Sequence, residues 1–254
     1  MNQESSLWSD AWRRLLANKA ALAGGIILLV LIFLAIFAPW IAPHSYSYQN
    51  LELGAQPPSS EFLLGTDTLG RDLFSRILYG ARVSLLVGFV ATSVALVIGV
   101  SWGIVAGYFG GRIDSVMMRI VDVLYGLPFI IFIILLMVIF GRNIWLLFAA
   151  IGAVEWLTMA RIVRGQVLTV KTQEYVLAAQ AMGVSNIQMF RKHIYPNILG
   201  PIAVYATLTI PQVMLLEAFL SFLGLGIQPP MSSWGTLIRY GVESMEEYLS
   251  LIHI

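Results

Sequence analysis

Residues 20–43 read AALAGGIILLVLIFLAIFAPWIAP and carry no charged side chain. An α-helix rises about 1.5 Å per residue, so roughly 20 apolar residues cross a hydrocarbon core of about 30 Å. The stretch meets that length, and Arg13, Arg14 and Lys19 precede it. Because it is longer than the apolar core of a signal peptide and lacks a small-residue cleavage site, we interpret it as an uncleaved membrane span.

The composition of the whole chain points the same way. Of the 254 residues, 58% are hydrophobic and 11% are charged, and the mean hydropathy is +0.81. Soluble domains contain about half apolar and about a quarter charged residues, so this chain is suited to lipid. A formal net charge of +1 excludes a broad basic surface, and we expect no nucleic-acid partner. The chain has no cysteine, which excludes disulfides and thiolate metal sites.

Four further apolar runs follow the first, and together they predict an all-α membrane protein with five transmembrane helices. Glu155 interrupts the fourth run, and Glu217 lies inside the fifth. The expected spans cover about residues 20–43, 83–109, 120–141, 143–161 and 197–223.

Lysine and arginine collect in three regions that fall on one side of the membrane if the spans alternate. These regions are the N-terminal tail, the connection 108–122 and the segment 161–193. Because positive residues stay in cytoplasmic loops, we expect a cytoplasmic N-terminus. Five spans would leave the C-terminus outside, and the apolar residues 248–254 are too short to cross a bilayer. We therefore expect that a sixth span is missing from this chain.

The basic loop between the fourth and fifth spans, residues 162–196, reads as two short helices around Gly183. Glycine permits a sharp turn there because it has no Cβ, and Pro196 opens the next span, where its missing N–H costs little. An apolar helix face in water is typical of an interface with another protein. An amphipathic helix lying on lipid gives the same pattern, and the residues alone leave both alternatives open.

Residues 174–183, EYVLAAQAMG, and residues 191–197, RKHIYPN, resemble the EAA loop of permeases from ATP-binding-cassette importers. In that family the loop sits in a groove of the ATPase subunit. Leu177 stands where the motif has an acidic residue, and Tyr195 stands where leucine is usual. In the peptide branch the glutamate commonly lies three residues earlier, as Glu174 does. The resemblance implies an ATPase-coupling loop formed by Glu174, Tyr175, Ala178, Ala179, Met182, Gly183 and Pro196.

Two more stretches resemble dipeptide, oligopeptide and nickel permeases. Residues 64–72, LGTDTLGRD, are similar to the segment before their second span, and residues 217–226, EAFLSFLGLG, to the end of their fifth. The likeness covers nearly the whole chain, which is similar to the second permease subunit, the one with a short outer loop after its first span. It implies a type I importer permease fold, with five spans here and six in a complete subunit.

The resemblance also implies partners and a location. We expect a multi-pass protein of the bacterial cytoplasmic (inner) membrane that pairs with a homologous second permease subunit. Two ATPase subunits, which bind ATP and magnesium, and an extracytoplasmic solute-binding protein complete the transporter. The expected solute is a dipeptide or oligopeptide, moved by alternating access, and the alternative within the family is nickel or a small chelate.

The residues 67–82 predict an amphipathic segment at the outer interface. Asp67 is a plausible N-cap for a helix from Thr68 to about Tyr79. Asp72 and Arg76 are spaced i,i+4 and would form a favourable local pair. We favour a structural role for this segment over contact with solute.

Ionisable and small residues also lie inside the expected spans. Glu217, towards the outer end of the fifth span, is a possible pathway or gate residue, although it could pair with an arginine or reach the interface. Arg119 and Asp122 are spaced i,i+3, which favours a local pair. Gly99, Gly103 and Gly107 recur on one helix face, and tight helix packing is favoured there over a sliding surface.

The sequence predicts no chemistry of its own. None of its three lysines follows a glycine, so the phosphate-binding GxxxxGK[ST] loop is absent. His44, His193 and His253 have no ligand spacing. We therefore expect a transport subunit with no catalytic, cofactor or metal site. Alternatives from other classes are a secondary transporter, which should carry midplane carboxylates, and a structural membrane scaffold.

Overall fold

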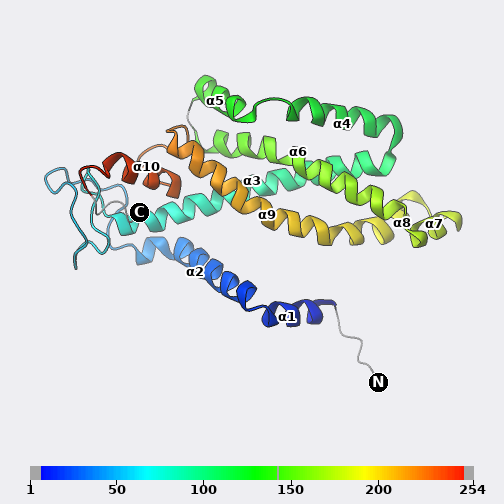
Figure 1. Ribbon diagram of the computed structural model, residues 1–254, viewed down its shortest axis with the longest axis horizontal. Coiled ribbons are helices and arrows are strands. Elements are labelled where there is room, and N and C mark those ends of the chain that lie inside the picture. The colour runs from blue at the N-terminus through cyan, green and yellow to red at the C-terminus, as the bar shows by residue number, and fades with distance from the viewer. Residues whose placement is uncertain (1–6, 142, 249–254) are drawn as a thin grey trace. The chain divides into compact units, whose positions relative to one another are not determined.

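The structure, a computed structural model, describes residues 7–141 and 143–248 (Figure 1). In these residues the regular elements are helices, and an isolated β-bridge joins Thr66 to Asp72. The all-α fold class is therefore confirmed. The chain divides into two units, residues 1–82 and residues 83–254, and the long helix α3 (Leu73–Phe109) begins in the first and ends in the second.

The first unit contains α1 (Leu7–Ala17), α2 (Lys19–Ile41) and the loop 42–72. Asn18 caps α2, because its side-chain oxygen accepts hydrogen bonds from the N–H groups of Ala20 and Ala21 at 3.1 Å. The helix is apolar on all sides and largely exposed; Leu29, for example, is 67% exposed. A helix of this kind is stable in lipid rather than in water.

The second unit is a bundle of long helices with short helices at its two ends. After α3, its elements are α4 (Gly111–Tyr125), α5 (Phe129–Phe140), α6 (Ile144–Lys171), α7 (Glu174–Ala181), α8 (Asn186–Met189), the π-helical turn η1 (Phe190–Ile194), α9 (Tyr195–Phe222) and α10 (Trp234–Ser244). Figure 1 shows α7 and α8 at one end of this bundle and α10 at the other.

In the part of the chain that is described, 4 stretches are long and apolar enough to cross a membrane, namely α2, α3, α6 and Asn186–Phe222. The number of candidate spans rises to 5 if α4 and α5 together count as one span, although these two helices are bent by 75° relative to each other. The bend falls just before Pro128, and a residue that precedes proline avoids the helical conformation. The third predicted span, residues 120–141, is therefore a broken helix rather than a straight one.

Two other predicted boundaries also differ. α3 begins at Leu73 rather than near residue 83, and α6 continues to Lys171 rather than ending near residue 161. Hydropathy marks only the stretch that suits the hydrocarbon core, whereas a helix can continue through the headgroup region, where Arg82 and Arg161 are tolerated. The first part of the loop 162–196 is consequently an extension of α6.

Three glycines bring α3 close to α6. A Cβ added to Gly103 would lie 2.5 Å from the carbonyl oxygen of Ala160, and one added to Gly99 would lie 2.6 Å from Cβ of Met159. Gly107 faces Val167 at a similar distance. The absent side chains therefore allow the two backbones to approach, which agrees with the predicted close packing of small residues.

Candidate functional site

The short helix α7 is held in place by the turns on either side of it. Its C-terminal end is closed by Gly183, whose φ of +79° is a left-handed conformation that residues with a Cβ rarely adopt. There the Val184 N–H donates to the Ala179 carbonyl at 3.2 Å, and the Met182 N–H donates to the Ala178 carbonyl at 3.0 Å. Gly183 thus ends α7 in the way that glycine commonly ends helices, and it turns the chain towards α8.

The inner face of α7 packs on the spans. Val176 and Ala179 are each 3% exposed and belong to one apolar cluster with Val167 of α6 and Ile198 of α9. This corrects one expectation for the coupling loop, because Ala179 faces this core rather than solvent. The Ala179 side chain therefore contributes to the packing of α7 on the spans.

The opposite face of α7 is open. Tyr175 and Leu177 of α7 are exposed, Met182 at its C-terminal end is 78% exposed, and Ile187 of α8 is 72% exposed. Glu174, Ala178, Gly183 and Pro196, which the sequence assigns to the coupling loop, are exposed as well. We call Tyr175, Leu177, Met182 and Ile187 the outer patch; it combines large apolar side chains with a position at the end of the bundle (Figure 1).

Hydrogen bonds tie the C-terminal end of α3 to this loop. Lys171, the last residue of α6, donates from Nζ to the carbonyl of Tyr108 at 2.7 Å and to that of Gly107 at 3.3 Å. The hydroxyl of Tyr108 donates to the carbonyl of Asn186 in α8 at 2.9 Å. The sequence does not predict these contacts, because the partners of Lys171 and Tyr108 lie on other helices and far away in the chain.

Two arginines of α6 pair with aspartates of α4. Arg164 forms two hydrogen bonds with Asp114, from Nε at 2.5 Å and from Nη2 at 2.6 Å. Arg161 pairs with Asp122 at 2.8 Å. The predicted local pair of Arg119 with Asp122 is thus wrong, since packing of α4 against α6 supplies a nearer arginine than the same helix does.

Glu217 is buried in a cluster of serines where α3, α9 and the start of α10 meet. The carboxylate accepts hydrogen bonds from the Ser221 hydroxyl at 2.5 Å and from the Ser84 hydroxyl at 3.4 Å. Both hydroxyls in turn accept from backbone N–H groups, Ser221 from Ile227 and Ser84 from Trp234, each at 3.2 Å. We call Ser84, Glu217, Ser221 and Ser233 the serine cluster; the last lies 3.3 Å from Ser221, oxygen to oxygen.

The position of Glu217 excludes one of its expected roles. Its side chain is fully buried, at 0% exposed, so it does not reach the interface, and serine hydroxyls contact its carboxylate. A role as a pathway or gate residue stays a prediction. Glu155, by comparison, is partly exposed on α6.

The segment before α3 differs from its prediction at the start. Asp67 accepts hydrogen bonds from the backbone N–H groups of Leu69 and Arg71, at 2.9 and 3.0 Å, but the chain from Thr68 to Asp72 forms a turn instead of a helix. Gly70, at a φ of +67°, interrupts the helical conformation. The helix begins at Leu73, with Asp72 rather than Asp67 bonding to its first turn.

The ion pairs of this segment also differ from the sequence-based expectation. Arg71 contacts Asp67 through Nε at 2.7 Å, and Arg76 contacts the same carboxylate at 3.1 Å. Arg76 and Asp72 are both buried, so they do not form a pair at an exposed surface. Asp67 therefore connects the turn to the first turn of α3, and the structural role favoured for this segment stays a prediction.

Comparison with known proteins identifies the family of this chain. Residues 99–252 match the family described as binding-protein-dependent transport system inner membrane component, and residues 6–58 match the N-terminal TM domain of oligopeptide transport permease C. The chain is 50% identical over 240 residues to the dipeptide transport system permease protein DppC of Bacillus subtilis (strain 168), covering 94% of this chain and 75% of that protein. This chain belongs to that permease family. It is also 48% identical over 243 residues to the oligopeptide transport system permease protein OppC of Escherichia coli (strain K12). The match covers 95% of this chain and 80% of that relative.

The family membership confirms the resemblance found in the sequence. The permease is an inner-membrane component of a binding-protein-dependent, ATP-driven transporter, and it crosses the membrane several times. Such a family transports solute and is not a family of enzymes. That the permease binds no cofactor or metal of its own stays a prediction.

Proposed function

We propose that the permease moves dipeptides or oligopeptides across the bacterial cytoplasmic membrane by alternating access. The relatives that support this cargo are named for dipeptide and oligopeptide transport. Nickel or a small chelate is the alternative within the family. Membership of a binding-protein-dependent family does not fit a secondary transporter or a structural scaffold.

The observation that carries the proposal is the two-sided character of α7. Its inner face is fixed to α6 and α9 by buried Val176 and Ala179, whereas the outer patch offers exposed apolar side chains. Exposed apolar groups at the end of a membrane bundle are typical of an interface with another protein. In the proposed assembly, this face contacts an ATPase subunit.

The proposed partners follow from this arrangement. Two ATPase subunits hold ATP and magnesium and push on the coupling loop. A homologous second permease subunit shares the pathway, and an extracytoplasmic binding protein delivers the solute. The N-terminus and the coupling loop lie on the cytoplasmic side, because arginine and lysine gather there.

Crosslinking tests the coupling interface directly. A cysteine is introduced as Met182→Cys in membranes that contain the complete transporter, and a short thiol-reactive crosslinker is added. We expect a covalent product with an ATPase subunit. Val176→Cys, whose side chain lies on the inner face, is the matched control and should give none. If Met182→Cys reacts only with lipid-anchored reagents, the proposed contact is wrong.

Uptake assays test the cargo. Cells that express the complete transporter should accumulate a labelled dipeptide, and excess unlabelled tripeptide should compete, whereas nickel salts should not. Competition by nickel with no effect of peptides would favour the alternative within the family.

A further inference from the structure

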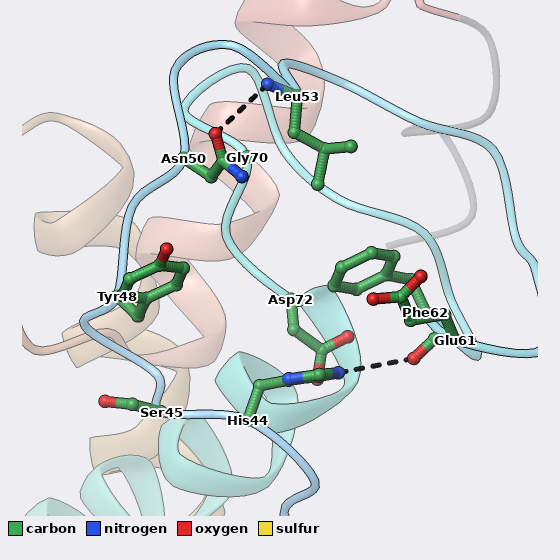
Figure 2. Close-up of a pocket in the computed structure, with 9 residues that line it drawn as sticks. All are labelled: His44, Ser45, Tyr48, Asn50, Leu53, Glu61, Phe62, Gly70 and Asp72. Carbon is green, nitrogen blue, oxygen red and sulfur yellow. Dashed lines mark hydrogen bonds between the residues drawn. The ribbon is translucent and has the colours of Figure 1, made fainter.

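A cavity of about 270 Å³ lies within the loop 42–72, and some of the residues that line it bond to one another (Figure 2). The His44 Nε2 donates to the Glu61 carbonyl at 3.3 Å, and the Asn50 side-chain oxygen accepts from the Leu53 N–H at the same distance. These groups are paired within the loop, so they hold its own structure together. An acidic side chain without such a partner lies instead in the second unit, on α6.

That side chain is Glu155, inside a membrane-spanning helix. It lies 155 − 144 = 11 residues after the start of α6, a rise of about 16 Å, which is about half of a 30 Å hydrocarbon core. The side chain is partly exposed and forms no hydrogen bond or ion pair with any residue that the structure describes. The two arginines of α6 are already paired with aspartates of α4, Arg161 with Asp122 and Arg164 with Asp114. The described part of the chain therefore supplies no cation to Glu155.

Glu155 interrupts the apolar packing between α6 and α9, two helices that contact each other. One turn before it, Ile151 belongs to a buried apolar cluster that includes Val213 of α9. One turn after it, Met159 belongs to a second buried cluster, which includes Ile202 of α9. Residues four apart lie on the same face of a helix, so Glu155 lies on the stripe of α6 that is turned towards α9.

The helix α3, which touches both α6 and α9, shows which residues of α9 lie at the same level. A Cβ added to Gly152 of α6 would lie 3.0 Å from the Val94 side chain, and one added to Gly88 would lie 2.8 Å from the Met214 side chain of α9. α3 runs parallel to α6 and antiparallel to α9 (Figure 1). The carboxylate on α6 lies three residues beyond Gly152, level with position 94 + 3 = 97 of α3, which is nine residues beyond Gly88. Nine residues before Met214 is Tyr205.

The α9 side of this level is also polar. Tyr205 is 39% exposed, and its hydroxyl has no hydrogen-bond partner among the residues that the structure describes. Thr209, one turn further along α9, is buried and donates from its hydroxyl to the Tyr205 carbonyl at 2.8 Å. A carboxylate and two hydroxyls therefore lie at neighbouring levels between two apolar clusters.

This arrangement suits a cation in a water-filled space better than it suits lipid. An acidic group inside the hydrocarbon core is costly, and such groups face a bundle interior or a cavity and pair with a partner. An ionised carboxylate only accepts hydrogen bonds, whereas a tyrosine hydroxyl both donates and accepts. An ammonium group, with three donors and a positive charge, complements this pair of acceptors.

We propose that Glu155 faces the solute pathway and accepts a hydrogen bond from the N-terminal ammonium group of the transported peptide, with the Tyr205 hydroxyl beside it. The assignment rests on the proposed function, because the ammonium group is the cation that every unmodified dipeptide carries. A basic side chain of the second permease subunit offers the same charge, and the experiment distinguishes the two sources.

The test measures equilibrium binding of labelled L-alanyl-L-alanine to the complete transporter in lipid nanodiscs, without its binding protein. N-acetyl-L-alanyl-L-alanine, which lacks the ammonium group, should compete at least about tenfold more weakly, because charged hydrogen bonds are the strong ones. In Glu155→Gln this preference should fall to nearly one, and dipeptide binding should weaken about tenfold. Tyr205→Phe, which removes only the hydroxyl, should weaken binding about threefold. Glu246→Gln, which removes an exposed charge after the end of α10, should change neither binding nor preference.

The other outcomes overturn the assignment. Equal competition by the acetylated dipeptide in the unsubstituted transporter, or an unchanged preference in Glu155→Gln, would remove the ammonium site. Loss of the second permease subunit from purified Glu155→Gln, with the preference retained in what remains, would assign Glu155 to subunit pairing. If Glu155→Gln fails to assemble at all, unchanged binding in Tyr205→Phe overturns the site.

Peptide uptake by cells is measured in parallel and separates this inference from the proposed function. Peptide uptake without an ammonium preference in binding overturns the site alone. Dipeptide binding with the preference, but without peptide uptake, overturns the proposed function alone.

Discussion

At the scale of single residues, Glu217 shows how a carboxylate is accommodated inside a membrane protein. Ser221 and Ser84 each accept a hydrogen bond from the backbone and donate one to Glu217. Glu217 is thus the last acceptor in two series of hydrogen bonds, which begin at the backbone N–H groups of Ile227 and Trp234. These chains fix the connection between α9 and α10 to the bundle.

Replacement of Glu217 by alanine should destabilise the permease strongly. The two hydroxyls lose their acceptor, which costs about 1–3 kcal/mol, and the removed side chain leaves a cavity that adds to this. We expect a lower unfolding temperature of the purified protein in detergent, measured by intrinsic fluorescence. Glu243→Ala, which removes an exposed partner of Arg239, should cost less than about 1 kcal/mol. Equal effects of the two substitutions would contradict the role of the serine cluster.

Replacement of Gly183 by valine should uncouple the loop without crowding it. A Cβ at this position has no heavy atom within 4 Å, but the φ of +79° is strained for a β-branched residue by about 1–2 kcal/mol. We expect α7 to shift, and both peptide uptake and copurification of the ATPase to fall. Gly165→Val, at a helical and similarly open position, is the control. Unchanged copurification in Gly183→Val would show that the turn is not needed.

At the scale of elements, the contact between α3 and α6 depends on the absence of side chains. A Cβ at Gly99 or Gly103 of α3 would meet backbone atoms of α6 at distances that real Cβ atoms essentially never show. Lipid is as apolar as leucine, so packing of this kind supplies much of the attraction between helices in a membrane.

Replacement of Gly103 by leucine should separate α3 from α6. Overpacking costs about 1–3 kcal/mol in a well-packed core, and here the obstacle is the Ala160 backbone, which cannot rotate away. We expect a lower unfolding temperature and less permease in the membrane, measured by quantitative immunoblot. Gly24→Leu, on a face of α2 with nothing within 4 Å, should leave both unchanged. A stable Gly103→Leu protein would mean that the two helices can part at little cost.

At the scale of the whole molecule, the outer patch is the surface on which we propose that an ATPase subunit docks. Met182→Asp places a charge in that interface while leaving the inner face of α7 intact. We expect uptake of a labelled dipeptide to fall at least about tenfold, since central interface residues contribute 2 kcal/mol or more. The unfolding temperature should stay the same. Gln188→Asp, also exposed but polar already, is the control, and full uptake in Met182→Asp would contradict docking through this patch.

Sequence patterns located the helices better than they located their ends and contacts. Uncharged runs identify helices that cross lipid, because charge is costly there. They do not report the direction of a helix, so the bend before Pro128 was missed although the proline was a signal. The pairing of Arg164 with Asp114 depends on how α4 packs against α6, and no local pattern contains that information.

The candidate sites, like the fold, could be predicted only in part from the sequence. The exposed residues of the coupling loop follow from its resemblance to a known motif, but a motif does not say which of them face inwards, as Ala179 does. The partners of Glu217 lie 4 and 133 positions away in the chain. Only the nearer of these, Ser221, falls within reach of helical spacing.

The hydrogen bond of Tyr108 has a mechanical consequence. Ser84 and Tyr108 stand on the same helix, and 108 − 84 = 24 residues at about 1.5 Å each separate them by roughly 36 Å. A rigid rod of that length, tilted by about 5° at the Tyr108 end, swings its far end by roughly 3 Å. The oxygens of Ser84 and Glu217 are already 3.4 Å apart, near the limit of a hydrogen bond. A tilt of this size between α3 and α9 would therefore part the two oxygens and release Ser84 from the serine cluster.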